Sequence, residues 1–103
     1  MESITITDRL ESAANSGVDE IYLYAWNNTK KRLEKEGLKF EETAIKSTRK
    51  GEHYYRISWA HAVVEDLPDN WTFSEIVDSH WDLSQSQLLW LMTQEDKKAK
   101  NNS

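Results

Sequence analysis

The chain has 103 residues, of which 38% are hydrophobic and 30% charged, with a net charge of −5 and no cysteine. This length fits one domain and is too short for two, and the apolar content excludes wholesale disorder. Without cysteine, disulfides, thiolate catalysis and cysteine-ligated zinc are excluded. No stretch approaches the ~18 consecutive apolar residues of a membrane span, and the first residues lack a signal-peptide pattern. We therefore expect a cytoplasmic protein without a membrane partner.

Charge is unevenly distributed along the chain. Residues 29–50 carry eight Lys or Arg against four acids, whereas residues 57–96 carry eight acids and no Lys or Arg. Such asymmetry can steer a charged partner, although it also serves simply to keep a small protein soluble.

Helical periodicity predicts two helices in the first third of the chain, over residues 6–16 and 18–36. Gly17 and Gly37 stand where glycine commonly ends a helix. Residues 4–6 also fit a short strand. The two apolar stripes are formed by Ile6, Leu10, Ala13 and Ala14, and by Val18, Ile21, Tyr22, Ala25, Thr29 and Leu33.

An antiparallel hairpin is predicted over residues 38–64, with a turn that contains Gly51. In its second strand Tyr55, Ile57 and Trp59 alternate with polar or partly polar residues, which is the period of a half-buried strand. The first strand alternates less cleanly, which indicates a bulge or a position at the sheet edge.

Two capping-box patterns, Thr72 to Glu75 and Ser84 to Gln87, predict helices over residues 73–80 and 85–96. We expect the polar residues 97–103 to form a disordered tail. The predicted fold class is therefore α+β. It is one compact domain over residues 1–96, in which a small antiparallel sheet packs with helices.

No pattern for catalysis, a cofactor or a metal is present. The three glycines are too scattered for a phosphate-binding loop, and there is no nucleophile elbow. The histidines include no His-x-x-x-His pair, so a metal site from His61, His80 and an aspartate would depend entirely on folding. We predict a non-enzymatic protein with no cofactor and no metal.

Nucleic-acid binding is the alternative function. Residues 72–95 resemble a helix-turn-helix in outline, with Trp81 inside and Gln85, Ser86 and Gln87 facing a major groove. The unit has four acids and no base before Lys97, which disfavours contact with phosphates. A second version places a single strand on a basic, aromatic hairpin surface. Its residues are Lys46, Arg49, Lys50, Tyr54 and Arg56.

The leading hypothesis is binding to another protein or to a second copy of the chain. Residues 88–92 make the last helix apolar around most of its circumference, and such a helix is either central or covered by a partner. A small domain can hardly bury it on every side, so we favour a partner. An acidic surface over residues 65–82, imitating nucleic-acid phosphates, offers a second means of recognition. The predicted interface residues are Tyr24, Trp26, Tyr54, Asp78, Asp82, Leu89 and Trp90.

Small, acidic, aromatic-rich chains without cysteine are common among bacterial and phage accessory proteins. That composition fits a regulatory, accessory or inhibitory role. It does not identify the partner.

Overall fold

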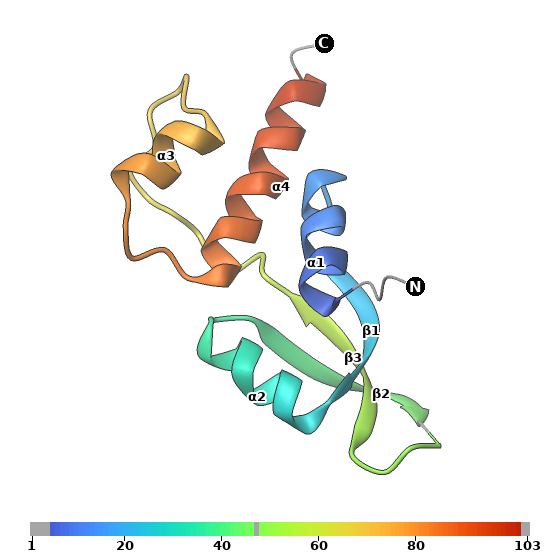
Figure 1. Ribbon diagram of the computed structural model, residues 1–103. Helices are drawn as coiled ribbons and strands as arrows, with labels where there is room; N and C mark the ends of the chain where they lie inside the picture. Colours follow the sequence, from blue (N-terminus) through green and yellow to red (C-terminus); the bar gives the residue numbers. More distant parts are fainter. Residues whose placement is uncertain (1–4, 47, 102–103) are drawn as a thin grey trace.

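The computed structural model describes residues 5–46 and 48–101. Within them the chain forms four helices and one three-stranded sheet, which confirms the predicted α+β class (Figure 1). No helix in this part of the chain is long and apolar enough to cross a membrane. The elements are α1 (Ile6–Asn15), β1 (Glu20–Trp26), α2 (Asn27–Lys35), β2 (Lys39–Lys46), β3 (Glu52–Ser58), α3 (Phe73–Ser79) and α4 (Gln85–Asn101).

The strands lie in the order β1-β3-β2, and β3 is antiparallel to both neighbours. β1 and β2 therefore run parallel and are joined by α2, with β3 inserted between them. Because side chains alternate across a strand, each strand sends every second residue to one face. That face carries Tyr55 and Ile57 of β3, which are buried in one cluster with Leu10 of α1, Leu33 of α2 and Leu89 of α4. Helices α1, α2 and α4 thus cover one face of the sheet.

The prediction of a helix over residues 18–36 is wrong in its first half. Residues 20–26 form β1, and the helix begins only at Asn27. The segment satisfies both periods, because Ile21 and Ala25 belong to the predicted helical stripe and also, with Leu23, alternate with aromatic residues. An unbroken ladder with β3 stabilises the extended form. The predicted helix end is confirmed, since Gly37 has φ +89°, which suits glycine.

The hairpin of β2 and β3 is confirmed, and β2 is an edge strand with a register shift between Glu42 and Lys46, as its irregular pattern predicted. The second strand ends at Ser58, earlier than predicted. α4 continues beyond the predicted boundary at residue 96, through to Asn101.

Both predicted capping positions at the C-terminal helices are used. Thr72 Oγ1 accepts a hydrogen bond from the Glu75 amide at 3.3 Å. At the start of α4 the bonds are reciprocal: the Ser84 amide donates to Gln87 Oε1 at 3.0 Å, and the Gln87 amide donates to Ser84 Oγ at 3.3 Å. These bonds join residues three apart, which is why the sequence alone reveals them.

α4 is the central helix of the molecule. Leu89 belongs to the cluster against the sheet, whereas Leu91 belongs to a second cluster with Val64, Trp71 and Ile76, and Trp90 packs against both. α1 lies along one side of α4 and α3 packs on another (Figure 1). Leu89 and Leu91 are therefore buried inside the molecule, whereas Leu88, Trp90 and Met92 are only partly buried, so a partner on this helix stays a prediction.

A buried polar group links α4 to the sheet. The indole nitrogen of Trp59, directly after β3, donates to Thr93 Oγ1 at 3.0 Å, and both side chains are fully buried. Thr93 Oγ1 in turn lies 2.9 Å from the carbonyl oxygen of Val18, just before β1. One hydroxyl thus connects three separate segments of the chain.

Candidate functional site

The face of the sheet opposite the helices carries a group of exposed aromatic side chains, which we call the aromatic face. It consists of Tyr22, Tyr24 and Trp26 of β1, which are exposed, and Tyr54 of β3, which is half-buried. In β1 these residues alternate with the buried Ala25 and the core-packed Ile21 and Leu23. The exposed fractions of Tyr22, Tyr24 and Trp26 are 52%, 50% and 45%. Large apolar groups are seldom left together in water without a role, so this face is the leading candidate site.

The tyrosine rings of this face contact one another across the β1–β3 ladder. Tyr54 pairs directly with Tyr24, and their ring centroids are 4.6 Å apart at a tilt of 57°. The Tyr22 ring is stacked with that of Tyr54 at 6.1 Å. Because each ring restricts its neighbours, the three phenol groups form one ordered surface before any partner arrives.

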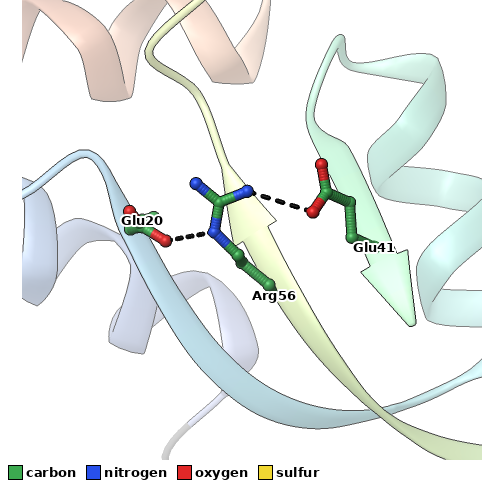
Figure 2. A network of polar contacts seen from close by, with 3 residues as sticks. All are labelled: Glu20, Glu41 and Arg56. Carbon is green, nitrogen blue, oxygen red and sulfur yellow. Dashed lines mark hydrogen bonds and ion pairs between the residues drawn. The ribbon is translucent and has the colours of Figure 1, made fainter. Parts of the chain in front are cut away.

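Arg56 borders the aromatic face and joins all three strands (Figure 2). Its Nε donates to Glu20 of β1, and its Nη1 donates to Glu41 of β2 at 3.1 Å. The hydrogen bond from Arg56 holds the pKa of the Glu20 carboxyl below its ordinary value of 4.5, and the same pair raises the pKa of Arg56. Two carboxylates thus engage the Arg56 guanidinium, and the three groups together carry one net negative charge.

The face continues into a hollow of about 430 Å³ beside α1. Ile6 and Arg9 of α1 line one side of it, and the tyrosine rings line the other. The hollow is lined by the apolar side chains Ile6 and Leu23 as well as by Arg9 and the tyrosines. It suits a side chain of a partner better than a free small molecule, which is normally enclosed on most sides.

The predicted interface residues fall into three places. Tyr24, Trp26 and Tyr54 share the aromatic face, where the two tyrosine rings are in contact. Asp78 and Asp82 are exposed where α3 leads into α4. Beside them Trp81 is 93% exposed, so its predicted position inside a helical pair is wrong.

The two residues predicted on the last helix lie inside the fold. Leu89 is fully buried and cannot reach a partner, which corrects that prediction. Trp90 is partly buried between the two core clusters. Its ring therefore acts mainly in packing.

The residues of the helix-turn-helix hypothesis are engaged within the chain. Ser86 is 2% exposed, and its amide donates to the carbonyl oxygen of Glu36 at 3.1 Å. The Gln85 amide donates to the Glu36 carboxylate at 3.2 Å, and the Gln87 side chain caps its own helix. The first turn of α4 thus packs against the end of α2, and Ser86 is unavailable to a DNA groove.

The histidines of the hypothetical metal site make separate hydrogen bonds. His61 Nε2 lies 2.6 Å from the carbonyl oxygen of Gly37, and His80 Nδ1 lies 3.1 Å from that of Ile76. Within residues 5–46 and 48–101, no three side chains of His, Cys, Asp or Glu gather closely enough to hold a metal ion.

Sequence reasoning missed Tyr22 as a site residue. It was assigned to the buried stripe of a helix, whereas in β1 it is exposed next to Tyr54. The strict alternation of residues 21–26 was the signal that could have found it.

Comparisons of the chain with models of protein families, with curated proteins and with solved structures found no significant match. No function can therefore be carried over from a relative. The chemistry of the aromatic face is what bears on function.

Proposed function

We propose that this chain is a non-enzymatic binding protein whose aromatic face contacts another protein. The observation that carries the proposal is the gathering of Tyr22, Tyr24 and Trp26, each about half exposed, on the face of the sheet opposite the helices that the structure describes. Tyrosine and tryptophan are the side chains that most often supply binding energy at protein interfaces.

The arrangement of the rings supports the proposal. A tyrosine has few rotatable bonds, so fixing it on a partner costs little conformational entropy. Here Tyr54 is already in contact with both Tyr22 and Tyr24, which reduces that cost further. The phenol oxygens add hydrogen-bonding groups to an otherwise apolar surface.

Charge favours a protein over a nucleic acid as the partner. Binding to phosphates depends on available Lys and Arg side chains, but Arg56 beside the rings is paired with Glu20 and Glu41. The net charge of −5 also repels a polyanion. Stacking of single-stranded bases on the same tyrosines is the second candidate, because exposed rings on a sheet suit bases as well as side chains.

A capture experiment with matched variants tests the proposal. The tagged chain is incubated with lysate, with and without nuclease treatment, and retained material is compared for wild type, Tyr24→Ser/Tyr54→Ser and Trp81→Ser. The last variant removes an aromatic ring that is even more exposed but lies between α3 and α4, outside the sheet. Circular dichroism checks that all three chains are folded.

We expect a protein that wild type and Trp81→Ser retain and that the tyrosine variant loses. Equal retention by all three would refute a role for the aromatic face. Loss with Trp81→Ser alone would move the site to the acidic segment around Asp78 and Asp82. Material that disappears on nuclease treatment would replace the protein partner with a nucleic acid.

A further inference from the structure

One edge of the sheet has backbone groups without partners. Among the described residues β1 pairs only with β3. Bonds from the Trp59 amide to the Asp19 carbonyl and from the Asn27 amide to the Gly51 carbonyl fix the pattern of this ladder. Since bonded and non-bonded pairs alternate in antiparallel strands, the odd residues of β1 bond to β3. The even residues, Tyr22 and Tyr24 at the centre, direct their N–H and C=O groups outward.

The two edges of the sheet differ in protection. β2 carries charges at Lys39, Glu41, Glu42 and Lys46 and has a register shift, and both features discourage an added strand. In contrast, residues 21–26 of β1 include no charge, no proline and no bulge. Natural sheets normally protect edges of this kind, so an unprotected one indicates that another strand covers it.

Space for such a strand lies beside β1. Two hollows, of about 430 and 490 Å³, are lined by residues of both β1 and α1, and Leu23 and Arg9 line both hollows. A strand placed along β1 sends alternate side chains toward these hollows and toward the aromatic face.

We propose that the added strand is β1 of a second copy, paired antiparallel about Leu23. In this register Tyr22 lies opposite Tyr24 of the second copy, so the free backbone groups of both residues are satisfied in both chains. Glu20 lies opposite Trp26, and no like charges face each other. The pairing is symmetric under a two-fold rotation axis, as an isologous dimer requires.

A second copy also explains why only one edge is open. The dimer joins two three-stranded sheets through β1 and leaves a protected β2 at each end, so assembly stops at two chains. A strand from a different protein would cover β1 as well, but it would not explain why β1 is open while β2 is protected. This inference concerns the edge of the sheet, and goes beyond the proposed function. It places the aromatic faces of both copies side by side as one larger surface.

The test measures self-association of the full chain by sedimentation equilibrium over a range of concentrations. A contact made mainly by one strand is smaller than a standard interface of about 1,600 Å², so the dimer should dissociate on dilution. Two variants remove the same rings and differ only in charge: Tyr22→Lys/Tyr24→Lys and Tyr22→Lys/Tyr24→Glu. In the proposed register, residue 22 of each copy lies opposite residue 24 of the other. The double-lysine variant therefore places two lysines opposite each other in both of these pairs. The lysine–glutamate variant places a lysine opposite a glutamate in both.

We expect wild type to dimerise and the double-lysine variant to dimerise about tenfold more weakly than the lysine–glutamate variant. In a register with Tyr22 opposite Tyr22, the lysine–glutamate variant would instead set lysine against lysine. A wild-type chain that stays monomeric at every concentration would overturn the proposal. So would two variants of equal dimer affinity. Neither result depends on capture of another protein, so the proposed function stands or falls separately.

Discussion

Replacing Thr93 by valine should destabilise the fold without changing its packing volume. Valine has nearly the shape of threonine, so the substitution removes the hydroxyl and leaves no cavity. The buried Trp59 N–H, which donates to Thr93 Oγ1 at 3.0 Å, then has no acceptor. An unsatisfied buried donor costs about 1–3 kcal/mol. We therefore expect the free energy of unfolding to fall by about 2 kcal/mol, the middle of that range.

Thermal unfolding followed by far-UV circular dichroism measures this effect. At about 2.1 cal/mol/K of unfolding entropy per residue, a loss of 2 kcal/mol in a chain of 103 residues lowers Tm by about 9 °C. Thr93→Ser is the matched control, because it keeps the hydroxyl and loses one methyl group, worth about 1 kcal/mol. If Thr93→Val melts no lower than Thr93→Ser, the hydroxyl does not satisfy the indole, and the reasoning fails.

Three further predictions concern the core and the sheet. Gly37→Ala should destabilise by about 2 kcal/mol or more, since alanine resists a positive φ and its Cβ would lie 2.4 Å from a serine oxygen of α4. Gly51→Ala should lose less in the same urea titration, because its Cβ would meet the Trp26 ring at an ordinary contact distance of 3.8 Å. Trp90→Ala should cost about 3 kcal/mol or more in that titration, whereas an interface residue would leave stability unchanged. Arg56 lowers the pKa of Glu20, so this carboxylate stabilises the fold above pH 4.5 and the gain is lost as pH falls through the lowered pKa. The stability gap between wild type and Glu20→Gln should thus close on acidification below pH 4.5, and a constant gap would contradict it.

The elements that the sequence predicted correctly depend on neighbours close in the chain. Thr5 accepts from the Asp8 amide at the start of α1, and the capping bonds of α3 and α4 likewise join residues three apart. The hairpin is local in the same sense, because β2 and β3 are separated only by the turn around Gly51. Local signals of this kind are visible without knowledge of the fold.

Tertiary contacts decided the elements that the sequence predicted wrongly. Residues 20–26 fit both a helix and a strand. Pairing with β3 selects the strand, and the paired residues, such as Leu23 and Tyr55, are about thirty positions apart in the chain. The burial of α4 depends on α1 at the other end of the chain and on residues 64–76. Periodicity shows that a helix is apolar all round. It does not show whether the apolar surface of the helix is buried by other parts of the same chain or by a partner.

The same error in β1 concealed the candidate site. Tyr24, Trp26 and Tyr54 were each predicted as interface residues, but on a helix Tyr22 and Tyr24 would point about 200° apart. Only a strand puts both of them on one face and opposite β3, next to the ring of Tyr54. A helix also satisfies its own backbone hydrogen bonds, so no helical assignment of residues 20–26 could have revealed an edge able to pair with a second chain. Both proposals therefore follow from one structural fact, which is that this segment is extended.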